Sequence, residues 1–411
     1  MSLPSDSQRK HPKVDAKMLN EALSLHQSGS LDLAESLYRD LLRLSPDDTT
    51  ILSNLATLAL QKGSIDSGIK IIEKSLKINP KQYSALNNYG VMLQKVSRFA
   101  ESVEIFNRAI KLKPDYAEAH ANKANSLSEL KQFNEAEESY DKAIYYKPNY
   151  LKAYLNRGKS LKQSGQLTKA LSSFQEAQRL NPEIDFLSGE IFETKMHLGI
   201  WEDFDNNLHN LERKINAKKN TINPFPLLGL LDKPSLQKKN AEIYSSFNYQ
   251  NNNSFSSINH YQDNSKIRIG YFSADFHNHA TMHLMAELFE NHDKNFFELV
   301  AFSFGPNIVD AWRKRIMKCF DEFLDVRLRS DHDIVLLSRE KQIDIAIDLK
   351  GFTKDCRPNI FSLRCAPLQV SYLGFPGTMG SKFMDYLIAD HILIPEKNKC
   401  HYSEKIVFMP N

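Results

Sequence analysis

The chain has 411 residues, of which 41% are hydrophobic and 25% charged, and its formal net charge is +3. This length corresponds to about two or three domains, and so small a charge, with no basic run between aromatics, argues against a nucleic-acid-binding protein. The four cysteines lie in the last quarter of the chain without CxxC spacing, which is typical of reduced thiols and argues against a disulfide framework or a zinc site: Cys319, Cys356, Cys365 and Cys400.

The N-terminal segment is polar. Residues 1–17 lack the apolar core of a signal peptide. No uninterrupted apolar stretch approaches the roughly 20 residues that a membrane span needs. We therefore expect a cytoplasmic protein that binds neither a membrane nor nucleic acid.

Residues 15–184 carry prolines at a fixed interval of 34 residues, at Pro46, Pro80, Pro114, Pro148 and Pro182. A fixed period of this length is the signature of a helical solenoid. With proline as position 32, five repeats begin at Asp15, Thr49, Tyr83, Ala117 and Leu151. Position 8 is small and position 24 bulky in every repeat, which suits two closely crossing helices, and the proline ends the second helix because it cannot continue the hydrogen-bond ladder. The pattern resembles the tetratricopeptide repeat (TPR) and predicts an α-solenoid, a TPR superhelix.

Position 6 is asparagine in all five repeats: Asn20, Asn54, Asn88, Asn122 and Asn156. One residue at this phase of each first helix forms a ladder along the concave surface of a solenoid. An amide side chain offers an acceptor and two donors, so it can pair with the N–H and C=O of an extended peptide without reading its side chains. Two interpretations stay open: the ladder grips a polypeptide, or the asparagines bond between neighbouring helices.

The repeat period is lost from residue 185, while helical patterning persists to about residue 250. Prolines and apolar residues mix in residues 222–244, which predicts packed turns and short helices that rest on the following domain. The Asn- and Ser-rich residues 251–265 are expected to form an exposed polar linker.

Residues 266–411 alternate apolar strands with helices, which predicts a parallel sheet covered on both faces. Strands are expected at residues 267–273, 297–304, 343–349, 368–375, 384–390 and 404–410, and helices around residues 282–290 and 309–319. In such folds ligands lie beyond the carboxyl ends of the strands, so the loops that follow the strands form the candidate site.

Three of these loops contain residues with suggestive chemistry. The loop after the first strand supplies Asp275, His277, His279 and His283. The loop at 348–358 supplies Lys350, Lys354 and Arg357. The loop GFPGTMG at 374–380 has glycines that permit close backbone approach to a ligand. The histidines lack a matching Cys/Glu cluster, so we expect no metal site.

Several long motifs together resemble the protein O-GlcNAc transferase family, the O-linked N-acetylglucosaminyltransferases with their plant and bacterial relatives. They are IRIGYFSADFHNHATMHL, DLKGFTKDCRPNIFSLRCAPLQVSYLGFPGTMG, FMDYLIAD and YSEKIVFMP, with INPFPLLGLLDKPSLQ in the connector. The resemblance implies a GT-B glycosyltransferase, two Rossmann-like lobes around a cleft, of which residues 266–411 are the N-terminal α/β lobe. It also implies transfer of N-acetylglucosamine from UDP-GlcNAc to Ser/Thr of acceptor proteins held by the concave TPR face, with no cofactor beside this nucleotide-sugar substrate.

The resemblance also implies roles for individual residues. The DFxNHxTxHL pattern places the family's active-site histidine at His279, where a neutral imidazole would accept the proton of the acceptor hydroxyl or orient the acceptor. A phosphate oxygen of the donor is the alternative proton acceptor. Three further residues are implied to line the sugar side of the cleft: Thr281, Gly377 and Thr378. Lys350 and Asp348 stand where some relatives have asparagines, which argues against a direct catalytic role for either.

The sequence stops at Asn411, where the family's second lobe, with most of the contacts to the nucleotide, begins. We therefore expect a fragment of a longer protein or a naturally shortened one. We expect this chain alone to bind the donor poorly, because the leaving diphosphate would lack its stabilising groups. Two alternatives stay open beside the O-GlcNAc transferase: a non-catalytic TPR adaptor with a vestigial transferase lobe, and an O-fucosyltransferase that uses GDP-fucose.

Overall fold

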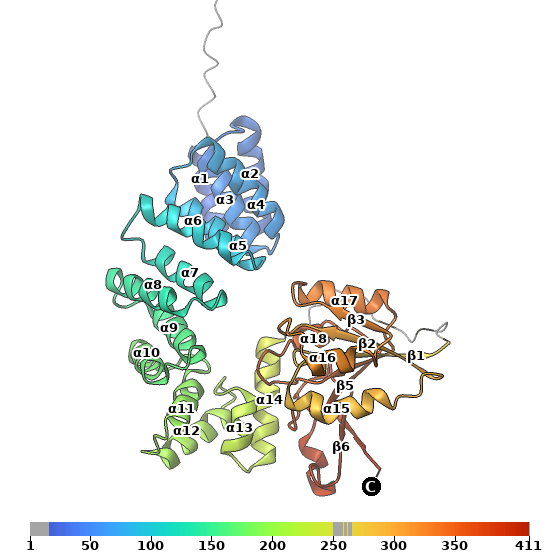
Figure 1. Cartoon of the computed structure of the whole chain (residues 1–411). Helices are drawn as coiled ribbons and strands as arrows, with labels where there is room; N and C mark the ends of the chain where they lie inside the picture. The colour runs from blue at the N-terminus through green and yellow to red at the C-terminus, as the bar shows by residue number, and fades with distance from the viewer. Residues whose placement is uncertain (1–15, 250–257, 259–260, 262–264, 411) are drawn as a thin grey trace, which may run out of the picture. The chain divides into compact units, whose positions relative to one another are not determined.

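The computed structural model describes residues 16–249, 258, 261 and 265–410. The chain divides into two compact units, Met1–Glu183 and Ile184–Asn411 (Figure 1). The polar linker predicted at residues 251–265 falls almost entirely outside the described residues. Within the described part of the chain, no helix combines the length and the apolar character that crossing a bilayer requires.

The first unit is a stack of antiparallel helix pairs, one pair for each predicted repeat (Figure 1). The first helices of the pairs are α1 (Ala16–Gln27), α3 (Thr49–Gln61), α5 (Tyr83–Lys95), α7 (Ala117–Glu129) and α9 (Leu151–Gln163). The second helices are α2 (Leu31–Leu44), α4 (Ile65–Ile78), α6 (Phe99–Leu112), α8 (Phe133–Tyr146) and α10 (Leu167–Leu180). Each second helix ends two residues before the repeat proline. The predicted TPR solenoid is thereby confirmed.

Positions 8 and 24 of each repeat pack against each other. Gly90 and Gly158 at position 8 lie against the rings of Phe106 and Phe174 at position 24, so close that a Cβ added to either glycine would stand 2.5 Å from a ring carbon. The other repeats have alanine at position 8 and Tyr or Ile at position 24. The bulky side chains at position 24 are at most 1% exposed. The size of one residue thus complements the size of the other within each repeat.

The second unit begins with four helices: α11 (Leu187–His197), α12 (Phe204–Asn216), α13 (Pro224–Leu230) and α14 (Pro234–Asn248). Both α13 and α14 start with a proline, whose missing N–H is not needed at a helix N-terminus. Helix α14 packs on the sheet that follows, because Ala241 belongs to its core and the Ser245 hydroxyl donates to the Met379 carbonyl at 2.6 Å. The segment 222–244 therefore rests on the following fold, as its apolar residues predict.

A sheet of seven parallel strands forms the rest of the unit. The strands are β1 (Ile267–Ser273), β2 (Phe297–Ser303), β3 (Glu322–Asp325), β4 (Ile345–Asp348), β5 (Leu368–Tyr372), β6 (Tyr386–Ala389) and β7 (Lys405–Phe408). Their order in the sheet is β3-β2-β1-β4-β5-β6-β7. The chain therefore moves outward from β1 to β3, crosses back, and continues on the other side of β1 from β4 onward. This crossing creates a topological switch point between β1 and β4, the place where open α/β sheets bind ligands.

Helices cover both faces of the sheet, which confirms the predicted α/β lobe (Figure 1). One face packs against α15 (Ala280–Glu290) and α16 (Ala311–Met317). The other packs against α14, α17 (Asp331–Glu340) and α18 (Asn359–Ser362), and a 3-10 turn, η1 (Glu396–His401), precedes β7. Successive residues of β1 serve opposite cores, with Tyr271 in one and Phe272 in the other.

Helices α17 and α18, the turn η1 and strand β3 were not expected from the sequence. Strand β3 is only four residues long and lies at the edge of the sheet, with no fully buried residue to mark it. Helix α17 begins with a polar first turn, DHD, which the Ser330 hydroxyl caps by accepting the Asp333 N–H at 3.1 Å. Its buried face consists mainly of Ile334 and Val335, too short an apolar pattern to indicate a helix by itself.

Candidate functional site

The strand order places all three predicted loops at the same edge of the sheet, because β1, β4 and β5 are parallel neighbours. Strands β1 and β4 are neighbours and run parallel, so the loops that follow Ser273 and Asp348 leave the same edge of the sheet side by side. These loops contain Asp275 with His279, and Lys350, respectively. The switch point therefore holds charged and imidazole groups from two strands that are 75 residues apart in sequence.

The Lys350 ammonium and the Asp275 carboxylate form a buried ion pair at this point. Lys350 Nζ donates to Asp275 Oδ2 at 2.7 Å, and the two side chains are only 6% and 9% exposed. Such a pair is costly to break, because removing one partner leaves an uncompensated charge out of water. Asp275 Oδ2 also lies 3.6 Å from Nδ1 of His279, whose side chain is 43% exposed. The buried ion pair thus lies directly next to the imidazole of His279, which is accessible to solvent.

His279 also begins helix α15. Its Nδ1 accepts the backbone N–H of Thr281 at 3.2 Å and lies 3.1 Å from the Thr281 hydroxyl. This cap satisfies one of the free N–H groups at the helix start and fixes the imidazole against the loop. Thr281 is itself buried, so it contacts the histidine and lies largely out of solvent.

Asp348, the last residue of β4, holds the turn that carries Lys350. Its carboxylate accepts the backbone N–H of Lys350 at 2.9 Å and that of Gly351 at 3.1 Å. Burial raises the pKa of Asp348 to about 6, against the opposing effect of the two backbone N–H groups and of the Lys350 charge. Asp348 is 2% exposed and therefore acts on the backbone of the loop, not on a bound ligand.

The other charged and imidazole residues of the two loops have separate surroundings. The His283 Nε2 lies 2.9 Å from Asn278 Oδ1, and its ring packs on Trp312 with the centroids 3.9 Å apart. Nδ1 of His277 is buried without a hydrogen-bond partner in the described part of the chain. Arg357 pairs with Asp331 at 2.6 Å, whereas Lys354 is exposed. None of these interactions joins the Asp275–Lys350 pair.

Glycines of the loop at 374–380 pack closely on the backbone of other segments of the protein. A Cβ on Gly374 would stand 1.9 Å from the Leu349 carbonyl oxygen, and one on Gly380 would stand 2.4 Å from the backbone of Ala241. The expectation that these glycines leave room for a ligand therefore needs correction at both positions. Gly377 and Thr378 line a polar pocket of about 190 Å³ with residues of α13, α14 and η1, and its lining includes no residue of the loop after β1.

Thr378 is buried and bound to Glu404, a residue that sequence reasoning did not single out. The Thr378 hydroxyl donates to Glu404 Oε2 at 2.6 Å, and the Met379 N–H donates to Oε1 at 2.6 Å. The Ser403 N–H contacts both Thr378 Oγ1 and Glu404 Oε2, at 3.0 and 3.1 Å. Burial raises the pKa of Glu404, while these hydrogen bonds oppose the shift. In the sequence, the contact between Thr378 and Glu404 is indicated only by the position of Glu404, a single acidic residue directly before strand β7.

Replacing Thr378 by valine is expected to lower the unfolding free energy of the second unit by about 2 kcal/mol, because the carboxylate of Glu404 loses a buried hydroxyl donor. The hydrogen bond stabilises the ionised form, so the loss is expected to shrink as the pH falls and Glu404 takes up a proton. Urea unfolding followed by tryptophan fluorescence measures this unit alone, since Trp201 and Trp312 both lie in it. Thr378→Ser keeps the hydroxyl and should match the unmodified chain; equal losses in both variants would refute the role of the hydroxyl.

Three of the five ladder asparagines of the first unit make hydrogen bonds between repeats. Three donate from Nδ2 to the preceding repeat: Asn88 to Thr57 Oγ1 at 2.8 Å, Asn122 to Asn87 Oδ1 at 3.0 Å and Asn156 to Asn125 Oδ1 at 3.0 Å. Bonding between neighbouring helices thus accounts for one donor of each of these amides. Among the described residues, no hydrogen bond to their Oδ1 atoms is found, and the side chains are half-buried. A carbonyl oxygen and one N–H of each amide remain for a ligand, so peptide gripping stays a prediction.

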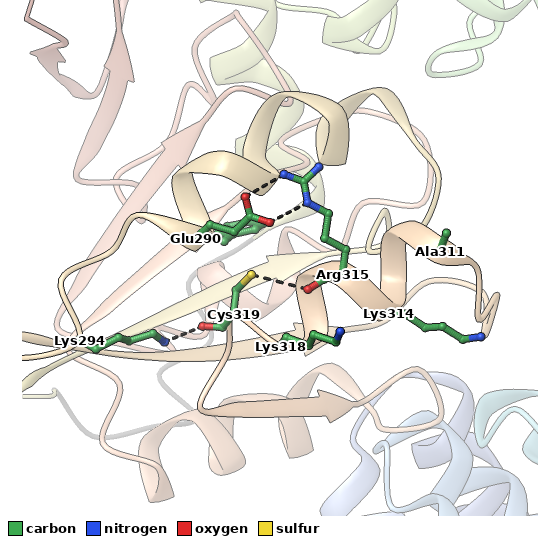
Figure 2. A pocket seen from close by; sticks show the side chains of 8 residues that line it. Glu290, Lys294, Ala311, Lys314, Arg315, Lys318 and Cys319 are labelled. Atoms are coloured by element: carbon green, nitrogen blue, oxygen red, sulfur yellow. Dashed lines mark hydrogen bonds and ion pairs between the residues drawn. The ribbon is translucent and has the colours of Figure 1, made fainter.

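Figure 2 shows a wide groove of about 690 Å³, whose lining includes no residue of the loops after β1 and β4. Most of its lining residues lie in the last turns of α15 and α16 or directly after these helices, before β2 and β3: Glu290, Lys294, Lys314, Arg315, Lys318 and Cys319. These residues lie at the amino edge of the sheet, opposite the loops described above. Arg315 pairs with Glu290 at 2.6 Å and Lys294 donates to the Cys319 carbonyl at 2.5 Å, so part of the basic charge serves the fold. Cations at helix C-termini also compensate the helix dipole. The charged residues of this groove therefore serve the fold, and they do not support a catalytic role for the groove.

Comparison with known protein families gives a consistent assignment. Residues 237–411 match the model described as glycosyl transferase family 41, and residues 25–88, 83–116, 117–150 and 151–184 match tetratricopeptide repeat models. Among curated proteins, the chain is 40% identical over 146 residues to the probable UDP-N-acetylglucosamine–peptide N-acetylglucosaminyltransferase SEC of Arabidopsis thaliana; the match covers 36% of this chain and 15% of that protein. It is 35% identical over 147 residues to the UDP-N-acetylglucosamine–peptide N-acetylglucosaminyltransferase of Caenorhabditis elegans, covering 36% of this chain and 13% of that protein.

A solved structure also resembles the chain. A mutant O-GlcNAc transferase of Thermobaculum terrenum aligns with a TM-score of 0.51 and 22% identity, over 80% of this chain and 57% of that one. At this identity the likeness bears on the fold alone. It agrees with helical repeats followed by a parallel sheet lobe.

Proposed function

Since the chain belongs to the protein O-GlcNAc transferase family, glycosyl transferase family 41, we propose that it transfers N-acetylglucosamine from UDP-GlcNAc to Ser/Thr hydroxyls of acceptor proteins held by its TPR solenoid. In this reaction the hydroxyl oxygen forms a bond to the anomeric carbon while the bond from that carbon to the diphosphate oxygen breaks. UDP leaves, and the hydroxyl proton passes to an oxygen of the departing diphosphate. No metal is required for this balance.

One observation carries this proposal. An accessible imidazole, His279, stands at the switch point of the sheet above a buried ion pair, within the region that matches the family. A switch point is where an open α/β sheet binds its ligand, and a histidine there can hydrogen-bond a substrate oxygen. The N-terminal lobe of a GT-B enzyme would present such a histidine to the acceptor.

Thr281, Gly377 and Thr378 have a different place in the proposal. Thr281 acts through the cap of α15, since its N–H and hydroxyl both contact Nδ1 of His279. Thr378 acts through Glu404 and shapes the loop after β5. Gly377 and Thr378 both line the pocket beside α13, α14 and η1, and since Thr378 is bound to Glu404, we propose Gly377 as the contact on the sugar side.

The test is a transfer assay with radiolabelled donor on the longest product of this reading frame. We expect label from UDP-GlcNAc to appear on Ser or Thr of a protein acceptor, and no label from GDP-fucose. Label from GDP-fucose instead would identify a fucosyltransferase. Polypeptide binding without transfer from either donor would identify a non-catalytic adaptor.

The asparagine ladder supplies a test of the acceptor groove. Replacing Asn88, Asn122 and Asn156 together by alanine is expected to weaken binding to an array of Ser/Thr-containing peptides by about tenfold or more, because the amides lose their hydrogen bonds to peptide backbone. Circular dichroism should show unchanged helical content.

A matched control distinguishes binding of a peptide by the asparagines from their hydrogen bonds between repeats. Thr57→Val removes the acceptor of the Asn88 bond between repeats while the Asn88 amide stays in place. Thr57→Val should therefore retain peptide binding, whereas Asn88→Ala should not. If both single variants lose binding equally, the ladder is structural.

A further inference from the structure

Lys350 and His279 compete for the same oxygen atom. Asp275 Oδ2 accepts from Lys350 Nζ at 2.7 Å and lies 3.6 Å from His279 Nδ1, just beyond hydrogen-bond distance. The ammonium is buried with its partner, whereas the imidazole is nearly half exposed. The geometry therefore assigns the oxygen to the lysine and leaves the histidine without a carboxylate partner.

The other contact of His279 determines where its proton resides. A backbone N–H can only donate, and the N–H of Thr281 points at Nδ1 from 3.2 Å. Nδ1 therefore contributes a lone pair, and in the neutral imidazole the single proton resides on Nε2. A free carboxylate beside Nδ1 would favour the opposite tautomer, with the proton on Nδ1 and directed at Asp275.

We propose that Lys350 is a positioning residue that fixes the tautomer of His279. By occupying Asp275 Oδ2, Lys350 prevents this carboxylate from drawing the imidazole proton onto Nδ1. His279 then offers an Nε2–H group, a hydrogen-bond donor, to a substrate oxygen. The inference rests on the proposed function only for the identity of that substrate.

The loop after β4 is built to keep Lys350 in place. Asp348 binds the backbone N–H groups of Lys350 and Gly351, and the Thr353 hydroxyl donates to the Lys350 carbonyl at 2.8 Å. Two further titratable groups face this loop: His277, with its ring centroid 5.9 Å from that of His279, and Asp310, which accepts the backbone N–H of Asn278 at 2.6 Å. The Asp275 carboxylate, 3.6 Å from Nδ1, is the acidic group that lies against the His279 ring in the described part of the chain.

Nitrogen-15 NMR of the histidine-labelled 411-residue chain tests this proposal, because two- and three-bond couplings identify which ring nitrogen carries the proton. The His279 signal is assigned by its absence in His279→Gln. Spectra are recorded at about pH 8.5, well above the ordinary imidazole pKa of about 6.5, so that the ring is neutral. The unmodified chain should show His279 mainly as the Nε2–H tautomer.

Three variants complete the cycle. Lys350→Met should convert His279 mainly to the Nδ1–H tautomer, because the Asp275 carboxylate is released. Asp275→Asn, and the double variant Asp275→Asn with Lys350→Met, should both retain the Nε2–H tautomer, because no carboxylate remains. Lys341→Met, which removes a lysine from its pair with Glu322 elsewhere in the same unit, is the matched control and should leave His279 unchanged. Should Lys350→Met fail to fold, the double variant, which buries no uncompensated charge, and Asp275→Asn still report the tautomer.

The outcomes are separable from those of the transfer assay. An Nδ1–H signal in the unmodified chain, an Nδ1–H signal in either variant that lacks the Asp275 carboxylate, or an unchanged tautomer in a folded Lys350→Met variant, would overturn the proposal. The expected tautomers without any sugar transfer would leave the proposal standing and reject the proposed function. In an active enzyme, Lys350→Met should lower kcat more than it changes the KM for acceptor, and Asp275→Asn in the same chain should restore part of the loss.

Discussion

Replacing His279 by alanine is expected to lower the rate constant for sugar transfer by about two to three orders of magnitude, the usual effect of losing one preorganised hydrogen-bond donor from an active site. The loss should fall on kcat, since in the proposed function the solenoid, and not this side chain, holds the acceptor polypeptide. Alanine also removes the side-chain cap of α15, which typically costs about 1 kcal/mol of stability. Steady-state kinetics with peptide acceptor, at a temperature where the variant is folded, measure the effect.

Two further variants make this result interpretable. His279→Asn keeps a capping side chain at the start of α15 but places no imidazole in the site, so it should be as inactive as alanine and more stable. His391→Ala removes an exposed histidine that stacks on Phe408 after β6, and its rate should stay within about twofold of the unmodified enzyme. Equal activity of His279→Ala and His391→Ala would exclude His279 from the reaction.

Replacing Gly374 by alanine is expected to destabilise the second unit by about 3 kcal/mol or more. A Cβ at this position would stand 1.9 Å from the Leu349 carbonyl oxygen and 2.5 Å from its carbon. Both are backbone atoms, so no side-chain rotation relieves the overlap, and the loop that carries Lys350 must move. Urea unfolding monitored by the fluorescence of Trp201 and Trp312 measures the loss in this unit.

Gly229→Ala is the matched control for that substitution. Gly229 lies in helix α13 of the same unit, and a Cβ there would meet no atom within 4 Å. Alanine should therefore stabilise this helix, by up to about 1 kcal/mol. Similar stabilities of the two variants would contradict the packing of Gly374 against the strand-β4 loop.

Much of the fold follows from periodicity in the sequence. The 34-residue interval predicts every helix pair of the solenoid because each repeat must bury the same small and bulky positions. The buried strands of the sheet, such as residues 267–273 and 368–372, are visible because a parallel strand covered on both faces is rich in apolar residues. Strand β3 was not predicted, because an edge strand of four residues buries too few apolar side chains to give a recognisable sequence pattern.

The candidate site was predictable only in part. Asp275, His279 and Lys350 were singled out because they lie in loops that follow predicted strands. The family resemblance then selected His279 among them. Their mutual arrangement depends on β1 and β4 being neighbours, which is a property of strand order and is not encoded locally. For the same reason the sequence did not show that Lys350 is buried against Asp275, or that Thr378 is bound by a glutamate 26 residues away.

The bond between Thr378 and Glu404 also bears on the order in which the lobe is completed during synthesis. The loop after β5 leaves the ribosome before the acid that fixes it, and at about 5–20 residues per second the interval is a few seconds at most. Until Glu404 emerges, the buried hydroxyl of Thr378 and the N–H of Met379 lack their partner. Nascent chains arrested before and after residue 404 should therefore differ in how readily a protease cleaves at Lys382, a few residues beyond this loop.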